Sequence, residues 1–172
     1  TWRHLVRSGV DESVAFTRTE QSITGPVSKI ISTQGIRAVY DSLSDSDKPV
    51  FAHAYAVAYK PMRGVLSEIY DEVASGNEIK SVIMANARLD RYPMESIETT
   101  PVWQVGQQVR KTQSDTETVA IDPMIAGIYV ATMIAQVDVL RDHNHAWSEV
   151  CNESIIESVD SLNPYLDYRG IS

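Results

Sequence analysis

The sequence predicts an all-α fold in a single domain that spans residues 1–172. Three observations predict it: apolar residues recur at helical spacing in several segments, capping residues precede these segments, and glycine or proline follows them. Asp11 and the pair Asp122-Pro123 are typical helix starts, and Gly76 is a typical helix end. A chain of 172 residues, 43% of them apolar, is long enough to bury a sizeable core.

The first expected helix begins after Asp11 and runs through VAFTRTEQSI towards Gly25 and Pro26. Pro26 fits early in a second helix, SKIISTQGIRAVYDSL, because the first turn of a helix tolerates proline. The cluster SDSDKP then predicts a turn followed by another helix start.

The third expected helix contains VFAHAYAVAY and reaches Pro61, which should kink or break it before MRGVLSEIYDEVAS. Gly76 ends that segment, and Asn77 is expected to cap the next helix, NEIKSVIMANARL. Residues 91–121 contain two prolines and many Thr and Gln residues without an evident helical period, so we expect an irregular connection there, pinned by Trp103 and Val105.

Asp122-Pro123 predicts a helix that runs to about Arg141, and HNH (143–145) predicts the turn into a last helix ending near Asn163-Pro164. Its apolar residues should share one arc: Trp147, Val150, Cys151, Ile155, Val159 and Leu162. On another arc stand Glu149, Glu153 and Glu157, which are spaced four residues apart.

These glutamates raise two alternatives. They form a solvated acidic face, or Glu153-x-x-x-Glu157 holds a hard divalent cation, which prefers oxygen ligands. Two carboxylates make an incomplete magnesium site, so a second acidic pair or a substrate would have to supply the rest.

Other clusters carry weaker signals. For Glu68, Asp71 and Glu72 we expect a solvated surface rather than a cation or a basic partner. His143 and His145 fit helix-end caps better than a metal site.

Composition excludes several classes of function. The net charge of −8 argues against a nucleic-acid-binding surface and against an anionic membrane as a general partner. The most membrane-like run, Met124 to Leu140, contains Gln136 and Asp138, so we expect a buried core helix and no transmembrane span. Cys151 alone allows no internal disulfide, which fits a reducing compartment such as cytosol, mitochondrial matrix or plastid stroma, and it is expected to be a buried thiol. No glycine-rich phosphate-binding loop is present in the sequence.

A faint internal repeat links the two halves. TEQSITGPVSKIISTQGI (19–36) parallels NESIIESVDSLNPYLDYRGI (152–171), which aligns Glu20 with Glu153 and Thr24 with Glu157. We therefore expect two pseudo-repeats, at about 9–90 and 122–172, joined by the connection at about 91–121.

Four blocks in order carry a family resemblance: SITGPVSKIISTQGI, DEVASGNEIKSVIMA, PMIAGIYVATMIAQVDVL and SEVCNESIIESVDSLNPYLDYRGIS. Together they resemble the helical C-terminal domain of plant-type ketol-acid reductoisomerase (acetohydroxy acid isomeroreductase). The resemblance implies an all-α, duplicated and knotted domain of an enzyme that converts acetohydroxy acids to dihydroxy acids in branched-chain amino acid synthesis with NADPH and two Mg²⁺ ions. It places the family's metal-ligating E-S-x-x-E pair on Glu153 and Glu157, but not on Glu149, and it places no catalytic or NADPH-binding residue in this sequence.

The NADPH-binding domain and the second carboxylate pair of the family are missing from this sequence. We therefore expect the chain to be non-catalytic alone, to bind no NADPH, and to bind Mg²⁺ weakly if at all. The first hypothesis is a structural or linker subunit of a larger organellar assembly. The alternative is the C-terminal part of an active or split ketol-acid reductoisomerase, and a third is a small module that binds a cation or metabolite.

The expected partners are other protein chains or a reductoisomerase-like partner domain. The expected location is organellar, a plastid before a mitochondrion, with bacterial cytoplasm as another option. The expected contact residues lie on the connection and at the two ends of the chain: Tyr92, Trp103, Val105, Trp2, Tyr165 and Tyr168.

Overall fold

The computed structural model describes residues 1–93, 99–113 and 118–168, and every regular element among them is helical, which confirms the all-α prediction. Elements labelled η are π-helices, whose wider turns close through i→i+5 hydrogen bonds. In order they are α1 (Trp2–Arg7), α2 (Glu12–Phe16), η1 (Thr17–Gln21), η2 (Ile23–Val27), α3 (Ser28–Gln34), α4 (Ile36–Asp41), α5 (Lys48–Ala74), α6 (Asn77–Asn86), α7 (Pro101–Thr112), α8 (Pro123–Asp142), α9 (Trp147–Cys151), η4 (Asn152–Leu162) and α10 (Asn163–Tyr168).

The first long helical stretch runs from α2 through η1 and η2 into α3. Asp11 caps it as predicted, because its carboxylate accepts hydrogen bonds from the backbone N–H groups of Ser13 and Val14. The expected break at Gly25 and Pro26 is wrong, since η2 passes through both residues and continues into α3.

Two glycines end helices through backbone conformations that other residues rarely adopt. Gly35 (φ 89°) separates α3 from α4, so the single helix expected over residues 28–43 is two helices. Gly76 (φ 72°) ends α5 as predicted. Asn77 is the first residue of α6 rather than its cap, and its side-chain oxygen accepts a hydrogen bond from Lys80.

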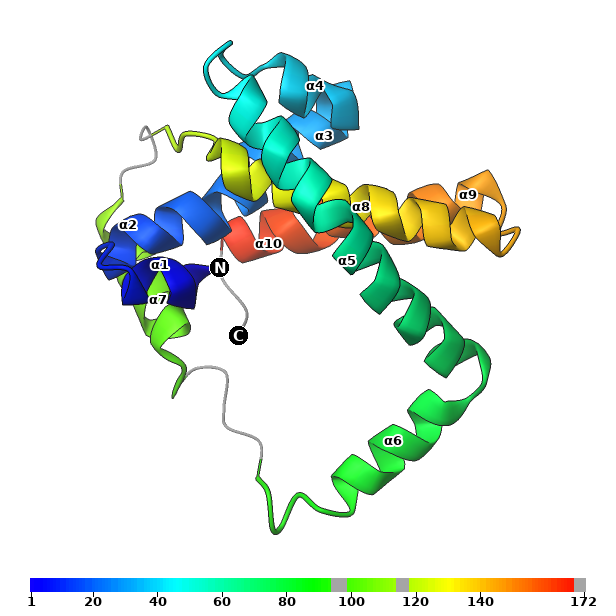
Figure 1. Ribbon diagram of the computed structural model, residues 1–172. Helices are drawn as coiled ribbons and strands as arrows, with labels where there is room; N and C mark the ends of the chain where they lie inside the picture. The colour runs from blue at the N-terminus through cyan, green and yellow to red at the C-terminus, as the bar shows by residue number, and fades with distance from the viewer. Residues whose placement is uncertain (94–98, 114–117, 169–172) are drawn as a thin grey trace.

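The long helix α5 crosses α8 at the centre of the molecule (Figure 1). Gly127 permits this crossing, because a Cβ atom there would lie 2.6 Å from the carbonyl oxygen of Phe51. Pro61 was expected to kink or break this helix, and the break is wrong, because α5 continues through it. Pro61 lies on the exposed side of α5, where water can bind the carbonyl group that the proline leaves without a partner.

The first core lies between α3, α4, α5 and α8 and the π-helices η2 and η4. Its buried residues are Val27, Ile31, Val39, Leu43, Phe51, Ala126, Val130, Met133 and Val159. By length and hydropathy α8 would be able to cross a membrane, but eight of its residues are buried inside the molecule, the pattern of a core helix.

The second core joins α1 and α2 to α7. Val102, Val105 and Val109, spaced three and four residues apart, pack against the buried residues Trp2, Leu5, Ala15 and Phe16. The irregular connection expected at 91–121 is therefore wrong for residues 101–112, which form α7. Val105 does pin this segment, as predicted. Trp2 belongs to this core, so it is not the exposed contact residue that we expected.

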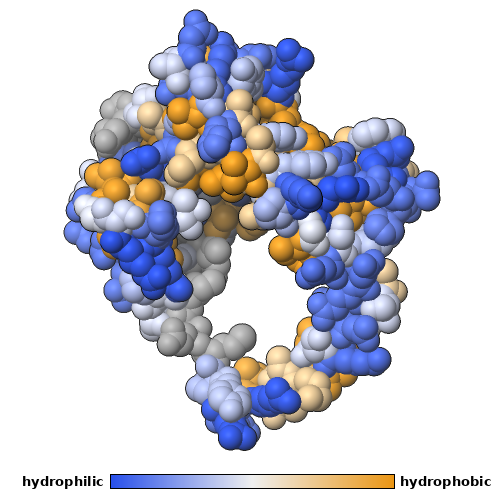
Figure 2. All heavy atoms as spheres, in the orientation of Figure 1, coloured by the Kyte–Doolittle hydropathy of each residue, from blue (hydrophilic) through white to orange (hydrophobic). Residues whose placement is uncertain are grey.

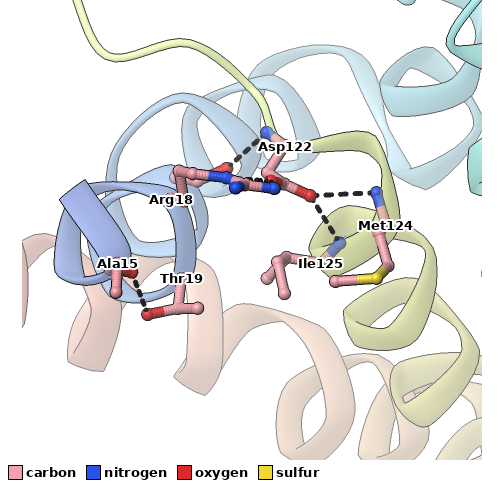
Figure 3. A network of polar contacts seen from close by, with 7 residues as sticks. Ala15, Arg18, Thr19, Asp122, Met124 and Ile125 are labelled. Atoms are coloured by element: carbon pink, nitrogen blue, oxygen red, sulfur yellow. Dashed lines mark hydrogen bonds and ion pairs between the residues drawn. The ribbon is translucent and has the colours of Figure 1, made fainter. Parts of the chain in front are cut away.

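A polar network joins η1 to the start of α8 (Figure 3). Asp122 is the predicted cap of α8: its carboxylate accepts hydrogen bonds from the N–H groups of Met124 and Ile125, both 3.1 Å. The other carboxylate oxygen pairs with Arg18 at 2.7 Å, and the backbone N–H of Asp122 donates to the hydroxyl of Ser22. The network fixes where α8 begins.

The last helix is one continuous stretch from α9 through η4 to α10. The arc of apolar residues expected on it is wrong in part, since Trp147 and Leu162 are 59% and 54% exposed and Cys151 is half-buried. Val150 and Val159 of that arc are buried as predicted, and so are Ser154 and Asn163, which were not placed on it. The four buried side chains are spaced four, five and four residues apart. A π-helix has more residues per turn than an α-helix, so the inward face follows this wider spacing.

Both segments of the proposed repeat contain π-helical turns, η1 and η2 in the first and η4 in the second. The pseudo-repeat itself remains a prediction. The end of its second copy, residues 169–172, lies outside the described residues, as does the side chain of Tyr168.

Candidate metal-binding site

The two predicted ligands, Glu153 and Glu157, stand one turn apart on the exposed side of η4. Both line an open cavity of about 680 Å³, together with Ser158, Ser161, Leu162 and Tyr165. The structure therefore brings the two carboxylates together on one surface that a cation in water can reach.

The side-chain amide of Asn152 lies close to both carboxylates. Its Nδ2 atom lies 3.4 Å from Oε1 of Glu153 and 3.3 Å from Oε1 of Glu157. One polar hydrogen donor thus contacts both groups, as a positively polarised ligand between them would. Asn152 was not predicted, although its place directly before E-S-x-x-E in the sequence was the available signal.

A buried polar network holds the opposite side of this helix in place. The amide of Asn163 donates to the hydroxyl of Ser28 at 2.8 Å and to that of Tyr129 at 3.0 Å, and Tyr129 in turn bonds the hydroxyl of Ser158. Ser158 thus ties η4 to α8, and Asn163 ties the start of α10 to α3 and α8. Ser158 lies next to Glu157, so the network also orients the carboxylate face.

Glu149, the third glutamate of the stripe, has a different partner. Its carboxylate lies 2.9 Å from Nδ1 of His145, and the other ring nitrogen of His145 lies 2.8 Å from the hydroxyl of Tyr70. The ring of His143 stacks on that of Tyr70, and its Nδ1 contacts the carbonyl oxygen of Val139 in the last turn of α8. His143 is thus a helix-end residue, as predicted.

Metal-ligand clusters of three or more His, Cys, Asp or Glu side chains do not occur among the described residues. In the acidic cluster at Glu68, Asp71 and Glu72, the carboxylate of Glu72 accepts a hydrogen bond from Ser81. Glu153 and Glu157 are therefore at most half of a metal site within the described part of the chain.

This half site suits Mg²⁺ in its chemistry. Both donors are carboxylate oxygens, both are exposed, and a hard cation that keeps several waters needs only one or two protein carboxylates from each side. The remaining ligands would have to come from water, substrate or another part of the protein.

A second cavity was not anticipated from the sequence. It measures about 220 Å³ and is lined by Phe16, Glu20, Thr24, Thr100, Val102, Trp103, Arg110 and Leu166. Trp103 was expected only to pin the connection. Helical spacing of Phe16, Glu20 and Thr24 was the one available signal, because these positions share a helix face.

The fold and the site define a helical domain that presents a pair of exposed carboxylates, Glu153 and Glu157, on a π-helix. Residues 1–115 match the family model described as "Ketol-acid reductoisomerase, C-terminal domain", and the chain belongs to this family. It is 45% identical over 177 residues to the chloroplastic ketol-acid reductoisomerase of Pisum sativum and 44% identical to that of Spinacia oleracea. Each alignment covers 99% of this chain and 30% of the relative, so the chain spans about a third of the length of these proteins.

Proposed function

We propose that this chain forms the C-terminal part of a ketol-acid reductoisomerase and supplies Glu153 and Glu157 to a shared Mg²⁺ site. One observation carries the proposal: the two exposed carboxylates share the amide of Asn152 and border the same cavity. Membership of the family supports it. The second carboxylate pair and the NADPH site would belong to another part of the protein.

In this role the chain would hold the metal ion and orient the substrate, and it would not catalyse the reaction alone. Bound Mg²⁺ would polarise a substrate oxygen as a Lewis acid. Glu153 and Glu157 would hold the ion by one side, and residues Ser158 and Ser161 border the space where a polar substrate would lie. Leu162 supplies apolar surface to the same cavity.

The test uses the natural protein that contains this chain, assayed for Mg²⁺-dependent reductoisomerase activity with NADPH. Glu153→Gln and Glu157→Gln should each lower activity by more than about 100-fold, because losing a ligand should cost more than losing an outer-shell partner. Glu149→Gln is the matched control: it removes the same charge from the same helix, but its carboxylate pairs with His145. Equal effects of all three variants would contradict the proposal.

A second function, contact with another protein, is favoured by the exposed apolar surface of α6 and of the end of α5. None of the residues of α6 is buried, and large apolar side chains on the two helices are at least half exposed: Val65, Ile69, Val73, Ile79, Val82, Ile83 and Met84. Figure 2 shows apolar side chains on α6, at the bottom of the view. Such patches are typical of protein contacts.

This surface fits the role of a structural or linker subunit in a larger organellar assembly. Its place differs from the contact surface that we predicted, although Tyr92 and Tyr165 are also at least half exposed. Intact mass spectrometry of the native polypeptide separates the two functions. A chain of this mass favours the subunit, and a chain about three times as long favours the enzyme, as the share of each relative covered implies. The chloroplastic relatives make a plastid the expected location.

A further inference from the structure

One tyrosine of α8 connects the first core to the helix that bears the two glutamates. Tyr129 is half-buried, and its side chain packs against the first core. Its hydroxyl lies 2.7 Å from that of Ser158, the residue directly after Glu157 on η4. Ser158 borders the same cavity as the two glutamates. A hydrogen bond thus joins the central helix to the neighbour of a predicted metal ligand.

The surrounding contacts fix the direction of this hydrogen bond. The hydroxyl of Ser28 gives its one hydrogen to the carbonyl oxygen of Ile23 at 2.7 Å, so it accepts from the side-chain amide of Asn163. The same amide nitrogen gives its second hydrogen to Tyr129 at 3.0 Å. Ser158 is then the acceptor that the described residues offer for the hydrogen of Tyr129. The hydrogen bonds therefore run in order from Asn163 through Tyr129 to Ser158.

The rotation of η4 about its own axis depends on contacts of this kind. Val159 packs in the first core, but apolar contacts are non-directional. Among the described residues, two side chains of η4 form hydrogen bonds to other helices, Ser158 to Tyr129 and Asp160 to Ser32. The contact of Asp160 is exposed to water, whereas that of Ser158 is partly buried, where a hydrogen bond is electrostatically stronger.

We propose that Tyr129 is a positioning residue for the metal site. Through Ser158, its hydroxyl holds η4 in the rotation that presents Glu153 and Glu157 to Mg²⁺. The inference rests on the proposed function, in which another part of the protein supplies the remaining ligands. Mg²⁺ demands near-ideal octahedral geometry, so a less firmly held helix binds it less tightly.

Mg²⁺ titration of the natural protein that contains this chain, by isothermal calorimetry without substrate, tests the proposal. Tyr129→Phe keeps the ring and removes the hydroxyl. It should raise the Kd for Mg²⁺ by at least about tenfold, the lower end of the range for outer-shell partners of metal ligands. Ser158→Ala should have a similar effect. The double variant should bind Mg²⁺ no more weakly than Tyr129→Phe alone, because both substitutions remove the same hydrogen bond.

Tyr59→Phe is the matched control. The hydroxyl of Tyr59 also bonds a side chain of α8, the carboxylate of Asp138, but this contact joins α8 to α5 and does not involve η4. Its loss should lower stability, measured by urea unfolding, without changing the Kd for Mg²⁺. Activity gives a second readout: Tyr129→Phe should need about tenfold more Mg²⁺ for half-maximal activity, with kcat at saturating Mg²⁺ within about twofold of wild type.

Glu157→Gln separates this proposal from the proposed function. If it abolishes Mg²⁺ binding while Tyr129→Phe leaves the Kd unchanged, the positioning role is wrong and the metal site stands. If Glu157→Gln itself leaves Mg²⁺ binding unchanged, the metal site is wrong and the positioning role with it. A Kd raised equally by Tyr129→Phe and Tyr59→Phe would show a general loss of stability and would also overturn the positioning role.

Discussion

Arg18 and Asp122, separated by 104 positions in the sequence, form a two-pronged ion pair at the start of α8. Nε and Nη2 of Arg18 lie 2.8 and 2.7 Å from Oδ2 of Asp122, whose other oxygen caps the helix. The Asp122 side chain is almost fully buried, whereas that of Arg18 is about half exposed. The carboxylate of Asp122 therefore caps the N-terminus of α8 and also links α8 to η1 through the ion pair.

Asp122→Ala should lower the free energy of unfolding by about 2 kcal/mol, of which about 1 kcal/mol is the lost cap and the rest the lost ion pair. Urea unfolding followed by circular dichroism measures the change. Asp11→Ala is the control. Asp11 also caps a helix through two N–H groups, but it takes part in none of the ion pairs found between described residues. An equal loss in both variants would show that the Arg18 contact adds nothing.

Gly127→Ala should lower the free energy of unfolding by about 1–3 kcal/mol, because the added Cβ would lie 2.6 Å from the backbone oxygen of Phe51, which cannot move alone. Gly64→Ala provides the opposite case within α5. A Cβ there meets no atom within 4 Å, so the variant should gain about 0.5–1 kcal/mol of stability from reduced backbone freedom. Thermal unfolding of both variants decides, and a stabilised Gly127→Ala would contradict the close helix crossing.

Local signals predicted two helix starts and one helix end. Asp11, Asp122 and Gly76 act where their chemistry placed them, because a cap or a positive φ depends only on neighbouring residues. The same kind of reasoning was wrong about the helix breaks expected at two prolines. Proline is expected to interrupt α-helices, but Pro26 lies in a π-helix, and Pro61 lies on the exposed side of a helix that packing against α8 holds together.

The shared placement of the two carboxylates follows from local sequence, while their role as metal ligands stays a prediction. The spacing of Glu153 and Glu157 placed both carboxylates on one exposed side, and a π-helix still does so. Trp147 and Leu162 were predicted to face inward from the last helix, but both are exposed. The prediction applied an α-helical period to a stretch that is largely a π-helix. No local pattern announces a π turn, and the buried contacts of Asn163 that accompany this one come from α3 and α8.

Tyr59 should make stability depend on pH in the alkaline range. Its hydroxyl donates to the carboxylate of Asp138 at 2.5 Å, and this hydrogen bond is the main cause that raises the Tyr59 pKa above 10.0. A raised pKa means that the contribution is fully present below the pKa of the unfolded chain and is lost as pH rises through the folded value. Tyr59→Phe should therefore be less stable than wild type at pH 7, with the difference closing above about pH 10.

Urea unfolding between neutral and alkaline pH measures this difference, with Tyr92→Phe as the control. Tyr92 is 62% exposed, and its ring contacts the guanidinium of Arg91. Its substitution should leave the pH profile unchanged. A gap between wild type and Tyr59→Phe that stays constant across this range would rule out the proposed role of the Tyr59–Asp138 hydrogen bond.

The buried side of the last helical stretch, η4 and α10, offers the last prediction, a pair of alanine substitutions with opposite outcomes. Asn163 donates to Ser28 and Tyr129, which also bond the carbonyl of Ile23 and the hydroxyl of Ser158, so Asn163→Ala removes one hydrogen bond from each of two hydroxyls and should lower the free energy of unfolding by about 1–2 kcal/mol. The hydroxyl of Ser154 is buried without a partner among the described residues, so Ser154→Ala should be neutral or stabilising by up to about 1 kcal/mol. Urea unfolding of both variants tests the pair. If Ser154→Ala is as harmful as Asn163→Ala, the inward face of η4 differs from the one described, and with it the outward placement of Glu153 and Glu157.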